Sequence, residues 1–185
     1  LLLDETAIAQ GFVTATALYD IEQFYDSIDL PHIVAFSSPL GDPPRLLAIA
    51  LQMHLSPRRI VKYGVCSVWV TPMAGIVAGC AQAHLFANMV LFGAMKELRA
   101  ALFGIWARQY VDDLAIRAQG LVNHVVQHLV AAAGILQQQL EAIQQPISNK
   151  KTCFTASSTV LAGALQVGFE AIGYGVQQVA EQKDL

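Results

Sequence analysis

The stretch that decides the fold is Arg108-Gln109-Tyr110-Val111-Asp112-Asp113-Leu114-Ala115-Ile116-Arg117. β-compatible runs, 105–111 and 114–118, flank the acidic pair Asp112-Asp113. An Asp-rich break of this length between such runs predicts a tight hairpin over 104–118 with both carboxylates at its tip. The alternative is that the turn uses Asp only because Asp tolerates turn geometry and stays solvated.

The composition is that of one packed domain. The chain has 185 residues, of which 55% are hydrophobic and 14% charged, so it is long enough for a sizeable core and we treat 1–185 as a single domain. Its three cysteines, Cys66, Cys80 and Cys153, are odd in number and widely spaced. They disfavour a disulfide framework or a zinc site, and they favour an intracellular location, cytoplasmic or nuclear, over secretion.

The mean hydropathy of +0.46 raises the question of a membrane. The most apolar windows, 80–95 and 121–136, are both interrupted by polar residues, and neither holds eighteen uninterrupted apolar residues. We therefore predict no transmembrane span and no membrane partner. The chain begins at Leu1 without a signal-peptide pattern, so we expect an internal piece of a longer polypeptide.

The net charge of −3 is not typical of a free-standing nucleic-acid-binding domain. Acidic residues are concentrated within 4–29, whereas Arg45, Arg58, Arg59 and Lys62 form a basic stretch just beyond. If nucleic acid is the partner, other parts of the parent protein must supply most of the phosphate-binding charge.

Hydrophobic periodicity and turn residues predict an alternation of strands and helices. The expected elements are a strand at 12–18, a helix at 30–36 capped by Asp26 or Ser27, a helix at 45–55, strand-like sequence at 60–70, a helix at 80–102, the hairpin, a helix at 120–145, a strand at 151–156, a helix or strand at 159–167 and a last strand at 171–179. This order predicts an α+β fold, an antiparallel sheet with helices packed on one face. Trp69 and Trp106 are expected to pack in the core or on a sheet face, in preference to acting as base-stacking platforms.

The acidic residues fall where strands meet turns. Asp20 ends the first strand, and Asp112 and Asp113 lie at the hairpin tip. If these strands are neighbours, three carboxylates converge on one sheet edge, where they repel each other unless a divalent cation lies among them. Oxygen ligands without His or Cys favour magnesium. Two such ions about 3.5–4 Å apart would activate a 3′-hydroxyl and stabilise a leaving pyrophosphate.

Five short motifs occur in a fixed order. They are Tyr19-Asp20-Ile21-Glu22-Gln23-Phe24-Tyr25-Asp26, Gly75-Ile76-Val77-Ala78-Gly79-Cys80, Tyr110-Val111-Asp112-Asp113, Ser148-Asn149-Lys150-Lys151-Thr152 and, more weakly, Ala171-Ile172-Gly173-Tyr174. In this order the chain resembles the palm of reverse transcriptases, especially those of non-LTR retrotransposons and group II introns. The third motif matches that family's Tyr-x-Asp-Asp box, and the last is similar to its primer-grip hairpin. The resemblance implies a palm whose fingers and thumb are largely missing.

The resemblance implies an RNA-directed DNA polymerase, a nucleotidyltransferase that uses two magnesium ions. Asp20 and Asp112 would hold both metals together with the Ile21 carbonyl, and Asp113 would complete the acidic cluster. Tyr25 falls at the position of the family's steric gate against ribonucleotides. Its alternative role is that of a core aromatic.

Two further positions carry over from the resemblance. Gly79, expected at the start of a helix, would leave room for the new base pair and offer backbone N–H groups to phosphate, unless it is an ordinary loop glycine. Lys151 would lie near the departing pyrophosphate as a cation or general acid, unless it is only a solvated surface charge.

The implied partners are an RNA template, a DNA primer and a deoxynucleoside triphosphate, together with the fingers and thumb of the parent polypeptide. An isolated palm fragment is expected to be inactive. Ala78 stands where the family usually has Gln, and 81–83 departs from the usual Pro-Leu-Ser. The alternative function is therefore a catalytically degenerate module that binds nucleic acid or acts as a scaffold, and a coincidental motif order is the third possibility.

Overall fold

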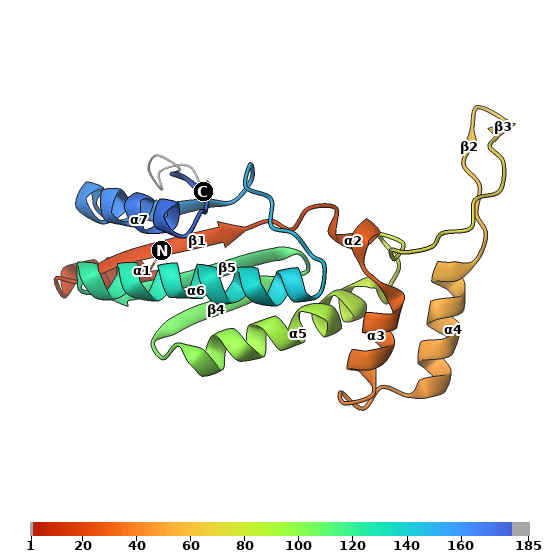
Figure 1. Cartoon of the computed structure of the whole chain (residues 1–185), viewed down its shortest axis with the longest axis horizontal. Coiled ribbons are helices and arrows are strands. Elements are labelled where there is room, and N and C mark those ends of the chain that lie inside the picture. The colour runs from red at the N-terminus through yellow and green to blue at the C-terminus, as the bar shows by residue number, and fades with distance from the viewer. Residues whose placement is uncertain (1, 179–185) are drawn as a thin grey trace. The chain divides into compact units, whose positions relative to one another are not determined.

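The computed structural model describes residues 2–178. It divides into two units, Leu1–Glu22 with Phe92–Leu185 and Gln23–Leu91, and the boundary falls inside helix α5 (Ala83–Ala101). Figure 1 shows the helices and strands of both units. Within 2–178, the helices lack the combination of length and hydropathy that crossing a membrane requires.

The first unit is built on a five-stranded sheet. In spatial order its described strands are β4 (Ile105–Tyr110), β5 (Asp113–Gly120), β1 (Val13–Tyr19), β6 (Cys153–Ala156) and β7 (Gln177–Gln178). All neighbouring pairs are antiparallel except β6 and β7, which are parallel.

One face of this sheet is buried beneath two helices. Ala17 of β1 lies between Ile116 of β5 and Phe154 of β6, and all three are at most 1% exposed. Helix α6 (Val122–Ala142) packs on β5 and β1, and α7 (Thr159–Ala171) packs on α6 and β6 (Figure 1). The α+β prediction, with helices on one face of an antiparallel sheet, is therefore confirmed.

The opposite face carries a polar contact with the first helix. Successive strand residues point to opposite faces, so Arg117 points away from the side of Ile116. Its guanidinium pairs with Asp4 at 2.8 Å and lies 5.1 Å from the ring centroid of Trp106. Asp4 belongs to α1 (Leu2–Ala9), a helix that the sequence periodicity did not reveal.

The second unit consists of short helices and a small hairpin. Its elements are α2 (Phe24–Ser27), α3 (Leu30–Ser37), α4 (Pro44–Leu55), β2 (Val61–Lys62), β3 (Val65–Cys66) and the first part of α5. The helix at 30–36 was predicted, but its cap was not. Asp29 holds the N-cap position without a side-chain cap bond, whereas Asp26 and Ser27 belong to α2.

Two boundaries in the C-terminal part and one packing prediction were wrong. Helix α7 continues to Ala171, because its apolar side chains keep helical spacing and Gly173, at φ +77°, follows as the residue that ends it. The predicted strand at 171–179 shrinks to Gln177–Gln178, and its last residue lies outside the described part of the chain. Trp69 is not in a core, since 64% of it is exposed.

Candidate functional site

The tip of the β4–β5 hairpin is a two-residue turn. Tyr110 pairs with Asp113, so the turn residues are Val111 and Asp112, one position earlier than the sequence predicted. Val111 has φ +59°, a conformation that is unfavourable for a β-branched residue. Sequence reasoning missed this position because it treated the acids as the turn-forming residues. Backbone strain of this kind is concentrated at functional sites.

Asp20 and Asp113 flank one and the same strand pair. Tyr19 is the last residue of β1 and lies opposite Leu114 of β5, so Asp20 directly follows this pair on one strand and Asp113 directly precedes it on the other. Both residues of the pair are buried on the helix-covered side, at 2% exposure. By strand alternation, the two carboxylates belong to the opposite side. The prediction that these strands are neighbours is confirmed.

The fourth motif runs beside the first. The Ser148 amide donates to the Asp20 carbonyl at 2.8 Å, and the Glu22 amide donates to the Pro146 carbonyl at 2.9 Å. These two bonds bracket Ile21, which bridges to Ile147, and neither of them uses the Ile21 carbonyl. A short antiparallel pairing thus fixes the segment after α6 against the end of β1.

The same pairing brings a lysine to the first carboxylate. The Lys151 ammonium lies 3.3 Å and 3.2 Å from the two carboxylate oxygens of Asp20. The Lys151 side chain is 69% exposed and that of Asp20 is 21% exposed. Lys151 is therefore more than an isolated surface charge, because it neutralises the carboxylate at the end of β1 while keeping its own access to solvent.

The structure brings some of the predicted magnesium ligands to the same sheet edge. Asp20 and Asp113 share the sheet edge, and Asp112 is half-buried in the turn beside them. Within residues 2–178, no group of three or more His, Cys, Asp or Glu side chains is arranged to hold a metal ion. The donors fit magnesium in kind, since one or two carboxylates with substrate phosphates are its usual ligands. The two-magnesium site stays a prediction.

In the second unit, the tail of the first motif is clasped by the second motif. The Ile76 amide donates to the Tyr25 carbonyl at 2.7 Å, and the Gly75 amide donates to the Ile28 carbonyl at 2.9 Å. A Cβ on Gly75 would lie 2.9 Å from the carbonyl oxygen of Asp26, and its φ is +84°. Glycine is therefore required here both for the backbone conformation and for the close approach.

Tyr25 itself is half-buried, and its ring meets Phe24 edge-on at 5.7 Å. Its position in the second unit does not test the predicted role as a steric gate. The expected position of Gly79 at the start of a helix was wrong, while its role toward the new base pair and phosphate stays a prediction. Helix α5 begins only at Ala83, and Gly79, at φ +83°, lies in a turn before it. The helix starts later than expected because the residues before it form separate turns. The Cys80 amide donates to the Val77 carbonyl, and the Ala83 amide donates to the Cys80 carbonyl.

His54 is a residue that the sequence analysis missed. It lies on α4 at 1% exposure, and its Nδ1 accepts a hydrogen bond from the Val77 amide at 2.9 Å. Burial lowers the pKa of this imidazole, and the nearby Arg58 lowers it further. A neutral His54 thus supports the loop of the second motif, which lines a 530 Å³ cavity together with Met53 and Gln82. A lone helical histidine gives no sequence signal for such a contact.

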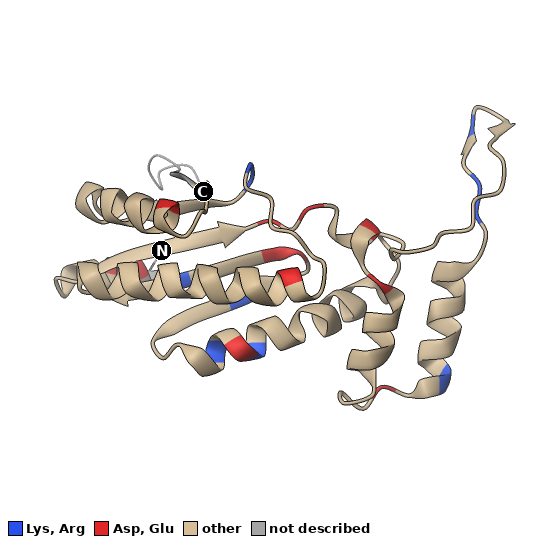
Figure 2. Cartoon of the chain, viewed as in Figure 1, with Lys and Arg blue, Asp and Glu red and all other residues tan. Residues whose placement is uncertain are grey.

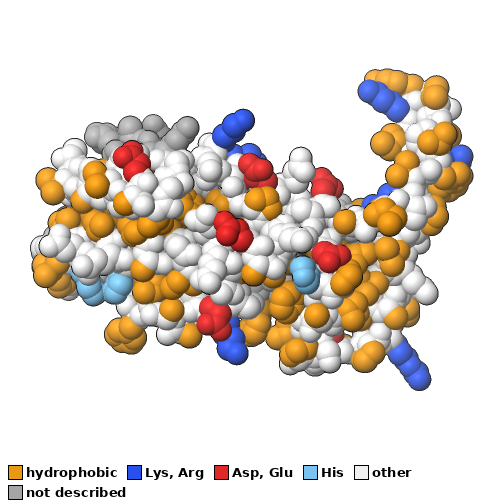
Figure 3. Space-filling model, in the orientation of Figure 1, with side chains coloured by type: hydrophobic (Ala, Val, Ile, Leu, Met, Phe, Trp, Pro, Cys, Tyr) orange, Lys and Arg blue, Asp and Glu red, His pale blue; other side chains and the backbone are white. Residues whose placement is uncertain are grey.

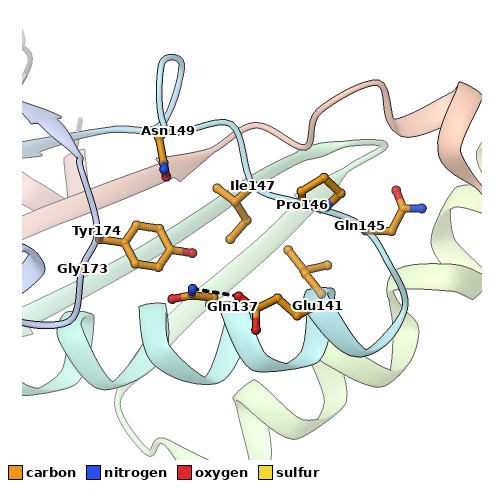
Figure 4. A pocket seen from close by; sticks show the side chains of 9 residues that line it. Gln137, Glu141, Gln145, Pro146, Ile147, Asn149, Gly173 and Tyr174 are labelled. Atoms are coloured by element: carbon orange, nitrogen blue, oxygen red, sulfur yellow. Dashed lines mark hydrogen bonds between the residues drawn. The ribbon is translucent and has the colours of Figure 1, made fainter.

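A smaller cavity of 190 Å³ lies beside the fourth motif (Figure 4). Its wall on α6 includes Gln137, which donates to Glu141 at 2.8 Å, and Tyr174 points into it from the other side. Burial raises the pKa of Tyr174, and the carboxylate of Glu141 adds to this shift. The ring of Tyr174 meets Tyr19 edge-on at 6.2 Å. The fifth motif therefore places an aromatic in the core, and no primer-grip hairpin is seen in the described residues.

Comparison with known proteins supports the fold. No protein-family model and no curated protein sequence matches the chain. Among solved structures, apo telomerase from Candida tropicalis truncated from its C-terminal domain superposes with a TM-score of 0.62 at 10% identity, covering 85% of this chain and 34% of that one. Telomerase from the same organism in complex with a TWJ fragment of telomeric RNA gives a TM-score of 0.64 at 9% identity, over 85% and 29%.

These similarities establish a reverse-transcriptase-like fold for this chain. The chain spans about a third of the length of the telomerase chains it matches. The resemblance seen in the sequence is thus confirmed at the level of the fold, whereas the non-LTR and group II intron subtypes stay predictions.

Proposed function

We propose that this chain is the palm of a reverse transcriptase, an RNA-directed DNA polymerase that extends a DNA primer on an RNA template. The observation that carries the proposal is the sheet edge where Asp20 and Asp113 flank one strand pair, with Lys151 bound to Asp20. The reverse-transcriptase-like fold supports it. The fingers and thumb of the parent polypeptide would complete the enzyme.

Asp20, Asp112 and the Ile21 carbonyl would hold two magnesium ions, and Asp113 would add negative charge beside them. When bound, the ions lower the pKa of the primer 3′-hydroxyl and stabilise charge on the triphosphate. Lys151, which pairs with Asp20 in this structure, would donate a proton to the departing pyrophosphate. Tyr25 would exclude the 2′-hydroxyl of a ribonucleotide by contact with its ring.

The decisive experiment is primer extension by the full-length parent protein with deoxynucleoside triphosphates and magnesium. Asp112→Asn keeps the size of the side chain but removes the charge, so extension should be abolished. Asp42→Asn, in the loop before α4, is the matched control and should extend primers as the wild type does. Normal extension by Asp112→Asn would refute the catalytic assignment.

A second candidate, a non-enzymatic nucleic-acid-binding or scaffolding module, is favoured by one observation. Ala78 and Ala81 line the 530 Å³ cavity at positions where reverse transcriptases usually carry Gln and Pro. This candidate predicts that the wild-type full-length protein binds RNA but extends no primer. It also predicts that Asp20→Asn and Asp112→Asn leave RNA binding unchanged.

A further inference from the structure

The second unit carries an exposed two-stranded arm, residues 58–70, which we call the ribbon (Figure 1). Val61 pairs with Cys66, and the turn at Tyr63 and Gly64 has positive φ at both positions, +50° and +78°. Two positive values define a type I′ turn, the form that suits the twist of a hairpin. The turn therefore preorganises the tip of the ribbon.

The ladder continues to the base of the ribbon through a bulge. Arg58 bridges to Val70, so two residues on the first strand face three on the second before the pairing of Val61 with Cys66. One extra residue in one strand is a β-bulge, which increases the local twist. Arg58 also donates from Nη2 to the His54 carbonyl at 2.7 Å, which ties the base of the ribbon to α4.

The ribbon has no core of its own. Tyr63 is 93% exposed, Val68 is 81% exposed and Trp69 is 64% exposed. An isolated two-stranded hairpin is only marginally stable in water. Apolar and aromatic side chains on both strands are therefore exposed to solvent in the free unit, as the space-filling view shows (Figure 3). A surface of this kind marks a site of interaction.

The positive charge of the ribbon indicates the chemical class of its partner. The whole chain has a net charge of −3, yet the segment 43–96 contains no acidic residue. Its cations are Arg45, Arg58, Arg59, Lys62 and Lys96. Only basic residues are coloured on the ribbon in Figure 2. With no carboxylate in the segment to neutralise it, the ribbon attracts a polyanion.

Two pairs of a cation and an aromatic ring lie on the ribbon. The Arg59 guanidinium lies 5.1 Å from the ring centroid of Trp69, and the Lys62 ammonium lies 5.5 Å from that of Tyr63. Each pair presents an exposed ring beside an exposed positive charge. An exposed aromatic ring stacks on an unpaired base, and the neighbouring cation contacts the phosphate of the same strand.

We propose that the ribbon is a binding surface for a single strand of nucleic acid, with bases stacked on Trp69 and Tyr63 and phosphates contacted by Arg59 and Lys62. A single strand fits better than a duplex, because stacking on these rings requires bases that are not already stacked. The ribbon lies outside all five motifs, so this binding does not depend on polymerase chemistry.

The test uses the full-length protein and fluorescently labelled twenty-nucleotide strands of oligo-U and oligo-dT, with binding measured by anisotropy. Trp69→Ala should weaken binding about tenfold, through the loss of one stacked base. The double variant Arg59→Ala with Lys62→Ala should reduce the slope of log affinity against log salt by about 1.4, because two phosphate contacts are lost. Comparing the two strands shows whether RNA or DNA is preferred.

Matched controls separate this surface from general charge and exposure. Arg45→Ala removes an exposed cation of the same acid-free segment, and Phe103→Ala removes an aromatic that is 97% exposed elsewhere. Both should bind as the wild type does. Because other parts of the parent protein can bind the strand too, ultraviolet crosslinking of bromouridine-substituted oligo-U supplies an independent readout. Crosslinks to Tyr63 or Trp69 are expected.

Several results would overturn the proposal. One is an absence of crosslinks within 58–70, and another is equal loss of affinity in the control and ribbon variants. Binding of the ribbon to vesicles containing phosphatidylserine but not to either strand would assign it to a membrane surface. A change in oligomeric state in Trp69→Ala, with unchanged strand binding, would assign it to a protein partner. Crosslinking to 58–70 does not require primer extension, so crosslinks to the ribbon in a protein that extends no primer would support this proposal while refuting the polymerase proposal.

Discussion

The two hairpins of this chain have turns of the same length and opposite surroundings. The β4–β5 hairpin belongs to a five-stranded sheet, in which β5 also pairs with β1, and it carries acids at its tip. The β2–β3 hairpin pairs only with itself among the described strands, and its tip carries Tyr63 beside Lys62. The first hairpin packs against other elements of its own chain. The side chains of the second are exposed and available to a partner.

The turns show the same contrast. The β2–β3 turn uses Gly64 at φ +78° after Tyr63, which matches the form that hairpins prefer. The β4–β5 turn places a buried valine, Val111, at φ +59°. A turn can hold such a strained residue only when the surrounding sheet supports it. Packing thus fixes the acidic tip, and local turn chemistry fixes the basic one.

The largest expected effect tests where the stability of the chain resides. Ile116→Ala removes a side chain of β5 that is 1% exposed, so the free energy of unfolding should fall by about 3 kcal/mol. Val65→Ala, on β3 at 72% exposure, should change it by less than about 0.5 kcal/mol. Urea unfolding measures both variants. Equal losses would remove the distinction between a packed hairpin and an unpacked one.

A smaller effect sharpens the description of the basic tip. Tyr63→Asn replaces a residue at φ +50° by one that tolerates this region, so the ribbon should gain about 1 kcal/mol of local stability. Hydrogen exchange at the Lys62 and Val65 amides should then slow about fivefold. Gly64→Ala, at φ +78°, should act in the opposite direction. Faster exchange in Tyr63→Asn would contradict the type I′ assignment.

The ion pair beside the acidic tip should contribute little to folding. Lys151 is 69% exposed, so Lys151→Met is expected to change the free energy of unfolding by less than about 0.5 kcal/mol. Chemical denaturation checks this value, with Lys150→Met as the matched neighbour. A loss of several kcal/mol would mean that Lys151 holds the sheet edge together instead of serving chemistry there.

The smallest effect concerns pH and the anchor of the basic hairpin. Burial lowers the pKa of His54 in the folded chain below its ordinary 6.5, so the unfolded chain binds the proton more readily. This contribution to stability is fully present above pH 6.5 and is lost as the pH falls below it. Denaturation at several pH values should show this loss in the wild type. His54→Asn should show a shallower dependence, and an identical slope would exclude His54 as the cause.

The sequence predicted the parts of the fold that depend on periodicity. The apolar stripe of α6 and the alternation around Asp112 give long, regular signals, and both elements are present, although the hairpin turn lies one residue earlier than expected. The acidic strand ends were also predicted to be neighbours, and the pairing of Tyr19 with Leu114 confirms this. Regular apolar periodicity therefore sufficed for the elements that bury one face in this sheet.

The features that were missed depend on contacts between distant residues. Helix α1 lacks a strong apolar stripe and is held by Asp4 to Arg117, a strand residue far along the chain. Trp69 was expected in the core or on a sheet face, yet it is 64% exposed. The sequence does not show whether a hairpin has a neighbour to pack against. The contact between His54 and Val77 likewise joins two segments that have no shared pattern.

The clasp between Ile28 and Gly75 has a consequence for how this chain can vary. The Gly75 amide donates to the Ile28 carbonyl, so the two ends of the segment 29–74, which contains the ribbon, are held together. The entropic cost of closing a loop rises only slowly with its length. Residues can therefore be inserted or deleted within this segment without disturbing the hydrogen bond that joins its ends. The length of the ribbon can therefore change at a small entropic cost while Ile28 and Gly75 stay joined.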